Sequence, residues 1–110
     1  MLVMSSKVKD VGGTDDFRTY FESLSEQDPL KKELRNAFLI LKENCMSGQK
    51  IEHDKWPTIY VKKYQINNLW RYALQSGWRF IYTIIGEPDG LIVSVLEVFS
   101  HKDYDERFEY

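Results

Sequence analysis

The sequence predicts an α+β fold in which two amino-terminal helices pack on one face of a small antiparallel β-sheet. Over residues 14–46 the apolar side chains recur every three or four positions, and from residue 68 onward they alternate with a period of two. Helices followed by a run of strands are typical of this fold class. With 110 residues, of which 43% are hydrophobic and 29% charged, the chain has the size and composition of one folded domain.

The first thirteen residues are predicted to form a flexible amino-terminal arm. Ser5, Ser6, Gly12 and Gly13 are poor helix formers in a stretch of mixed charge. The sequence also allows a short strand at residues 2–4. The single folded domain is then expected to cover residues 14–110.

Two helix starts are marked by capping residues. Thr14 is predicted to cap a helix over residues 14–25, and Asp28 to cap a second over residues 29–46 that Gly48 ends. Cys45 lies on the apolar stripe of the second helix, so we interpret it as a buried thiol and not as a nucleophile.

Three strands are expected in the second half of the chain, at residues 69–74, 78–85 and 91–99, joined by Gly-containing turns. Residues 48–57 are predicted to form a loop. The segment 59–66 is ambiguous, because the lysine pair at 62–63 interrupts a stretch of strand-forming residues. The last ten residues are expected to form a polar tail or a short helix.

Charge and cysteine content narrow the function classes. A net charge of −2 argues against nucleic-acid binding driven by the field of the whole molecule, so such a site must be local. The single cysteine excludes an internal disulfide and fits a reducing compartment. No stretch approaches the ~20 apolar residues of a membrane span. We therefore expect a cytoplasmic protein without a membrane partner.

Residues 55–82 combine five basic residues and eight aromatic ones with no acid. Cations that neutralise phosphates and rings that stack on bases are the chemistry of an RNA-binding surface. The alternative is that the aromatic side chains fill the core of a small sheet while the basic ones solvate its edges. Composition leaves both interpretations open.

Few other residues suggest a catalytic or ligand-binding role. The chain has no Gly-rich phosphate loop and no nucleophile motif, and His53 and His101 do not form a metal-ligand set, so no metal or cofactor is expected. Glu97, inside an apolar strand, is expected to form a structural ion pair with an arginine. The remaining candidates are basic or phenolic: Lys62, Lys63, Arg71, Arg79, His101, Lys102 and Tyr104.

The segment SGWRFIYTI, followed by an acidic turn, an apolar strand and HKDY, resembles the RelE/ParE superfamily of toxins from toxin–antitoxin pairs. The resemblance is greatest to the RelE and HigB-like messenger-RNA interferases, and it covers residues 14–108. Trp78 stands where the family pattern begins with a tyrosine, and Arg79 and Tyr82 follow that pattern. The resemblance implies a RelE-like fold.

It also implies an endoribonuclease that cuts messenger RNA, commonly on the ribosome, without metal. The ribose 2′-oxygen attacks the adjacent phosphate and leaves a cyclic phosphate. Arg79 would stabilise the phosphate, with Arg71 on the preceding strand. His101, Lys102 or Tyr104 would supply acid or base catalysis. Lys62, Lys63 and Lys102 would contact RNA, and a separate antitoxin chain would be the protein partner.

The chain also departs from the family, since its net charge is slightly acidic and its tail carries several acids where nuclease members have arginine. Three alternatives therefore stay open: a catalytically inactive protein-binding module on the same scaffold, a ParE-like gyrase inhibitor, and an unrelated α+β protein. In the inactive case Arg79 could instead pair with Glu97 across adjacent strands.

Overall fold

The computed structural model describes residues 7–108, which form an α+β fold with four α-helices and a five-stranded sheet. Two short 3₁₀ turns, η1 at Cys45–Ser47 and η2 at His53–Lys55, lie between the second and third helices. The elements follow one another as β1 (Val8–Gly13), α1 (Asp15–Ser23), α2 (Pro29–Glu43), β2 (Gln49–Lys50), α3 (Thr58–Tyr64), β3 (Trp70–Ala73), β4 (Arg79–Glu87), β5 (Gly90–Phe99) and α4 (His101–Phe108).

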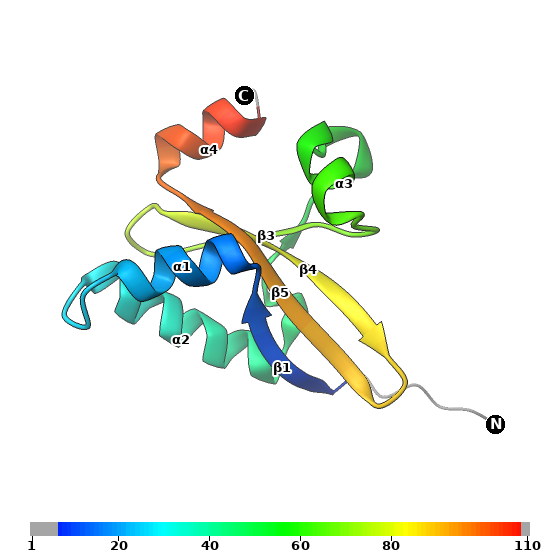
Figure 1. Cartoon of the computed structure of the whole chain (residues 1–110), viewed down its shortest axis with the longest axis horizontal. Helices are drawn as coiled ribbons and strands as arrows, with labels where there is room; N and C mark the ends of the chain where they lie inside the picture. Colours follow the sequence, from blue (N-terminus) through cyan, green and yellow to red (C-terminus); the bar gives the residue numbers. More distant parts are fainter. Residues whose placement is uncertain (1–6, 109–110) are drawn as a thin grey trace.

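The sheet has the strand order β1-β5-β4-β3-β2. Strands β4 and β5 form a long antiparallel hairpin that crosses the molecule (Figure 1), whereas β1 runs parallel to β5. The sheet is therefore mixed, and the prediction of a purely antiparallel sheet is wrong. The three predicted strands are confirmed as β3, β4 and β5, with boundaries that shift by one or two residues.

Strand β1 corrects the prediction that residues up to 13 form a flexible arm. Val8 is buried, with 3% of its surface exposed, and the strand pairs along β5 from Leu91 to Val95. Its partner lies some eighty residues away in the sequence, and its glycines and charged residues hide the strand pattern. The first six residues of the expected arm, with the strand considered at residues 2–4, lie outside the described residues.

The capping predictions for α1 and α2 are confirmed. The Thr14 hydroxyl accepts a hydrogen bond from the Phe17 amide at 3.1 Å, and the Asp28 carboxylate accepts one from the Leu30 amide at 2.9 Å. Helix α2 ends at Glu43 and not at residue 46, because Asn44 leaves the helical conformation. Cys45, in turn η1, is buried as expected.

Helices cover both faces of the sheet, whereas the sequence predicted only the two amino-terminal helices on one face. Helices α1 and α2 pack on one face, where Phe80 and Tyr82 of β4 join the core. The ambiguous segment is helix α3 and the tail is helix α4; both pack on the opposite face against Ile81 and Phe99. Figure 1 shows α1 and α2 side by side at the left of the view, with α4 and α3 at the top.

The segment between α2 and β2 is held to the sheet by one phenol. The Tyr82 hydroxyl donates to the Cys45 carbonyl at 2.7 Å and accepts from the Gly48 amide at 3.1 Å. Residue 48 lies so close to the sheet that a Cβ atom there would be 2.6 Å from the Arg71 carbonyl oxygen. Gly48 therefore allows its segment to approach strand β3 closely, which places Gln49 beside Arg71. It does not end helix α2, as the sequence predicted.

No helix in the described part of the chain is both long and apolar enough to cross a membrane.

The close approach at Gly48 predicts that Gly48→Ala destabilises the protein. The added Cβ would lie 2.5 Å from the Tyr82 hydroxyl, and overpacking of this kind costs about 1–3 kcal/mol. Urea denaturation monitored by circular dichroism measures the change. Gly86→Ala is the matched control, because its Cβ meets no atom within 4 Å; equal stability of the two variants would contradict this account of the segment.

Candidate functional site

The register of the central strands places Arg71 and Arg79 on the same face of the sheet. Arg71 of β3 lies opposite Ile81 of β4, and Arg79 precedes Ile81 by two residues on the same strand. Opposed residues, and residues two apart along a strand, project to the same side. Because Ile81 belongs to the core under α3 and α4, both arginines lie on the α4 face.

Helix α4 places Tyr104 beside both guanidinium groups. The guanidinium carbon lies 4.9 Å from the centre of the Tyr104 ring for Arg79 and 5.5 Å for Arg71. Arg71 also donates a hydrogen bond from Nη1 to the Tyr104 hydroxyl at 3.3 Å. The ring is completely buried and stacks on Phe108 at 4.4 Å. Each cation–π contact contributes about 0.5–2 kcal/mol, depending on how far the cation is desolvated.

Arg71 and Arg79 differ from the other three arginines of the chain, each of which pairs with a carboxylate. Arg18 pairs with Asp15, Arg35 with Glu26 at 2.7 Å, and Arg107 with Glu97 at 2.8 Å.

Within residues 7–108, neither Arg71 nor Arg79 forms an ion pair with a carboxylate, and Arg79 has no hydrogen-bond acceptor. Two guanidinium groups gathered at one ring without a counter-charge favour an anion between or beside them.

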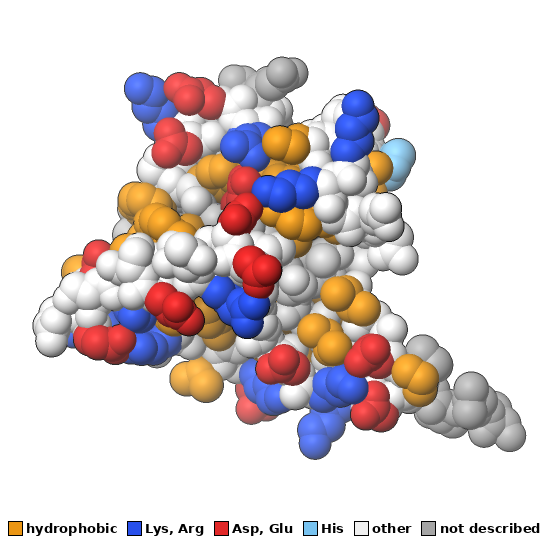
Figure 2. Space-filling model, in the orientation of Figure 1, with side chains coloured by type: hydrophobic (Ala, Val, Ile, Leu, Met, Phe, Trp, Pro, Cys, Tyr) orange, Lys and Arg blue, Asp and Glu red, His pale blue; other side chains and the backbone are white. Residues whose placement is uncertain are grey.

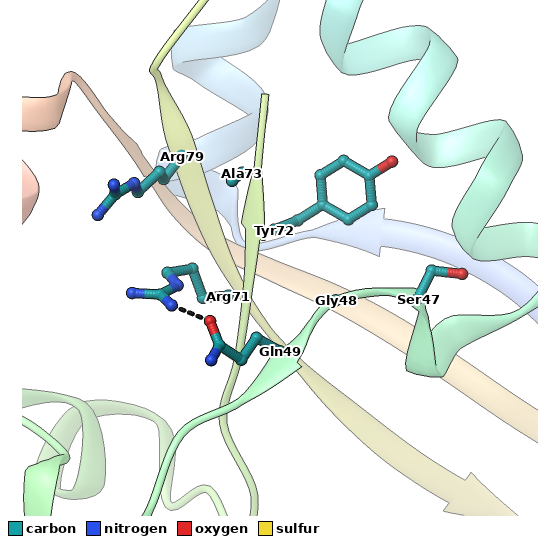
Figure 3. Close-up of a pocket in the computed structure, with 7 residues that line it drawn as sticks. All are labelled: Ser47, Gly48, Gln49, Arg71, Tyr72, Ala73 and Arg79. Carbon is teal, nitrogen blue, oxygen red and sulfur yellow. Dashed lines mark hydrogen bonds between the residues drawn. The ribbon is translucent and has the colours of Figure 1, made fainter. Parts of the chain in front are cut away.

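An open cavity of about 390 Å³ adjoins the arginine pair. Figure 3 shows Arg71, Arg79 and Gln49 projecting to one side of the strands, while Tyr72 and Ser47 point to the other. The Gln49 side-chain oxygen accepts a hydrogen bond from Nη2 of Arg71, which fixes that guanidinium at the cavity wall. The cavity is lined by Ser47, Gly48, Gln49, Arg71, Tyr72, Ala73 and Arg79.

Four of the predicted site residues take no part in this arrangement. His101 is exposed at the start of α4, with Nε2 3.4 Å from the Asp105 carboxylate. Lys102 is also exposed, and in the described part of the chain no hydrogen bond, ion pair or ring contact joins either residue to the arginine pair. Lys62 is exposed on α3, and Lys63 pairs with Asp16 of α1 at 2.9 Å. The structure thus brings together Arg71, Arg79 and Tyr104.

Glu97 forms the structural ion pair that the sequence predicts, but Arg107 is its partner. Its carboxylate accepts hydrogen bonds from Arg107 at 2.8 Å and from the Tyr60 hydroxyl at 2.7 Å. Burial, together with the bond to Glu97, raises the pKa of Tyr60 far above its ordinary value. The alternative pairing of Arg79 with Glu97 is wrong, because Arg79 lies opposite Phe99 on β5.

Sequence reasoning missed Gln49. It lies in a segment predicted to be a loop, and the two-residue strand β2 that contains it is too short to produce a periodic pattern. Its role depends on Gly48 and Tyr82, which bring the segment to β3 only in the folded chain.

On the face drawn in Figure 2, charge is mixed. Figure 2 shows acidic and basic side chains next to one another over α1, α2 and the end of the β4–β5 hairpin, with no large area of one sign. Among the described residues no three His, Cys, Asp or Glu side chains are grouped as metal ligands. This face therefore offers no larger basic area as an alternative to the arginine pair.

Comparison of the chain with protein-family models, with curated proteins and with solved structures finds no match. The chemistry of the site has to be inferred from its own residues.

The Glu97 contacts predict that Glu97→Gln affects stability and not the site. Loss of the charged hydrogen bond to Arg107 should lower the free energy of unfolding by about 1–2 kcal/mol. Affinity for inorganic phosphate, measured by isothermal titration calorimetry, should stay at the wild-type value, because Glu97 does not contact Arg71 or Arg79. A large change in phosphate affinity would mean that Glu97 sets the charge of the arginine site.

Proposed function

We propose that the protein is an endoribonuclease of the RelE kind, the toxin of a toxin–antitoxin pair, and that it cleaves messenger RNA at Arg71 and Arg79 without a metal ion. The observation that carries the proposal is the pair of guanidinium groups held 4.9 and 5.5 Å from one buried ring, with no carboxylate partner among residues 7–108. A RelE-like arrangement of the helices and sheet is part of the same proposal. A separate antitoxin chain would neutralise the activity, and the ribosome would present the message.

The reaction places increasing negative charge on phosphorus-bound oxygens. The 2′-oxygen forms a bond to the adjacent phosphorus while the bond from phosphorus to the 5′-oxygen breaks. One proton leaves the 2′-hydroxyl, and one is gained by the departing oxygen. Guanidinium groups suit this charge because their planar N–H donors match phosphate oxygens in pairs. Fixed donors of this kind each contribute about 10²–10³ in rate.

Tyr104 acts as a positioning residue in this proposal. Its ring is completely buried, so it does not reach a substrate in this conformation. It holds the guanidinium groups of Arg71 and Arg79 at the cavity by cation–π contact and, for Arg71, by a hydrogen bond. His101 is exposed on the same helix, and we assign proton transfer to its imidazole, the side chain that most often serves as a general acid or base.

A second candidate function is a non-catalytic RNA- or protein-binding module on the same scaffold. It is favoured by the residues that line the cavity, which include no His, Cys, Asp, Glu or Lys. The phenol of Tyr72 points away from the arginine pair (Figure 3). Such a module would bind an anion and leave it intact. A gyrase-directed toxin would arrest growth without cutting RNA.

Tightly induced expression of wild type and Arg79→Ala tests the proposal. Wild type should arrest growth and produce new messenger-RNA ends inside translated codons. Arg79→Ala should lose both effects, since removal of one preorganised donor slows the reaction about 10²–10³-fold. Mapping of messenger-RNA ends in the same cultures is the measurement.

Arg18→Ala is the matched control, because Arg18 is an exposed arginine already paired with Asp15. It should remain as toxic as wild type. Arrest without RNA cuts would favour the gyrase-type target, and soluble wild-type protein with neither effect would favour the binding module. Equal toxicity of Arg79→Ala and wild type would show that Arg79 is not in the site.

A further inference from the structure

A second, smaller cavity continues from the arginine site along the sheet edge. Its volume is about 190 Å³, and it shares Gln49 and Arg71 with the first cavity. The Gln49–Arg71 hydrogen bond therefore stands between the two hollows. The second cavity is lined by Gln49, Lys50, Ile51, Glu52, Lys55 and Arg71.

The walls of this cavity carry more positive than negative charge. The basic residues among its lining are Lys50, Lys55 and Arg71, and the single acid is Glu52. The Lys55 side chain is exposed, and within residues 7–108 it forms no ion pair. Other lysines of the described chain, such as Lys9, Lys31 and Lys63, are paired with carboxylates. The second cavity thus offers an uncompensated cation next to the shared arginine.

Lys55 is placed at the cavity by a fixed backbone. Turn η2 is closed by the Lys55 amide, which donates to the Glu52 carbonyl at 2.9 Å. The indole nitrogen of Trp56 donates to the Ile51 carbonyl at 2.9 Å, and the Ile51 amide donates to the Leu69 carbonyl at 2.9 Å. This series of bonds ties the turn to the start of β3.

Lys50 is less well placed than Lys55 to present its ammonium group to an anion in the second cavity. It follows Gln49 on strand β2, and successive side chains of a strand point to opposite faces. Gln49 points to Arg71 on the α4 face, so the Lys50 side chain is directed to the other face.

We infer that the two cavities bind two consecutive phosphates of one RNA strand, with Lys55 as the cation for the second. The inference rests on the proposed function, because the first phosphate is the one that Arg71 and Arg79 hold. Arg71 lines both cavities and contacts the RNA between the two phosphates. The smallest RNA that fills the site is a trinucleotide, whereas a dinucleotide with one phosphate fills only the first cavity.

Binding of short RNA to the full chain tests this inference. The probes are 2′-O-methyl uridine dinucleotide and trinucleotide, which carry one and two phosphates and cannot be cleaved by their own 2′-oxygen. Affinity is measured by calorimetry over a range of potassium chloride concentrations. Each phosphate contact on a single strand steepens the slope of log K against log salt by about 0.7. In wild type the trinucleotide slope should exceed the dinucleotide slope by about that amount.

Lys55→Ala should abolish the difference between the two slopes and leave dinucleotide binding unchanged. Lys55→Arg should restore it, because the charge is kept. The matched control is Lys32→Ala, an exposed lysine on α2 that lines neither cavity; both slopes should remain those of wild type. Arg79→Ala should weaken both probes.

Two results would overturn the inference, and they are distinguishable. If Lys55→Ala keeps the wild-type trinucleotide slope while Arg79→Ala weakens both probes, the second subsite is wrong and the arginine site remains. If wild type binds neither probe, the proposed RNA-binding function fails together with the subsite.

Discussion

The contact of two guanidinium groups with the buried ring of Tyr104 is the interaction on which the rest of the site depends. It requires three separate elements to meet: β3 supplies Arg71, β4 supplies Arg79, and α4 supplies the ring. Two like charges at one ring repel each other, and the cation–π attraction offsets part of that cost. The remaining positive charge has no carboxylate partner within residues 7–108, which makes the site receptive to an anion.

The scaffold provides this arrangement by placing helices on both faces of a mixed sheet. On one face α1 and α2 bury Phe80 and Tyr82, and on the other α3 and α4 bury Ile81. Arg79 projects to the second face because strand residues alternate. The network of Glu97, Tyr60 and Arg107 ties β5, α3 and α4 together next to the site. Helix α4 is thereby held where its tyrosine meets the arginines.

Local features of the sequence predicted much of the fold. Capping residues such as Thr14 and Asp28 act within one turn of the helix, and the alternating pattern of β3 to β5 reflects burial of each strand. Strand β1 and the two-residue strand β2 escaped prediction because their pairing is set by distant partners. In the site, Arg71, Arg79 and Tyr104 were implied by the resemblance of a short segment to RelE-like toxins. Gln49 was not expected there, and Lys55 was known only as one of the basic residues of the stretch 55–82, since only the folded chain brings turn and loop residues to the edge of β3.

The most direct test is nuclear magnetic resonance of the arginine side chains during titration with inorganic phosphate. The chain contains five arginines, so their ¹⁵Nε–H signals can be assigned by single Arg→Lys variants. The signals of Arg71 and Arg79 should shift together and saturate with one dissociation constant, while those of Arg18, Arg35 and Arg107 stay unchanged because carboxylates occupy them. Equal, non-saturating shifts of all five, or no shift of Arg71 and Arg79, would contradict an anion site at this pair.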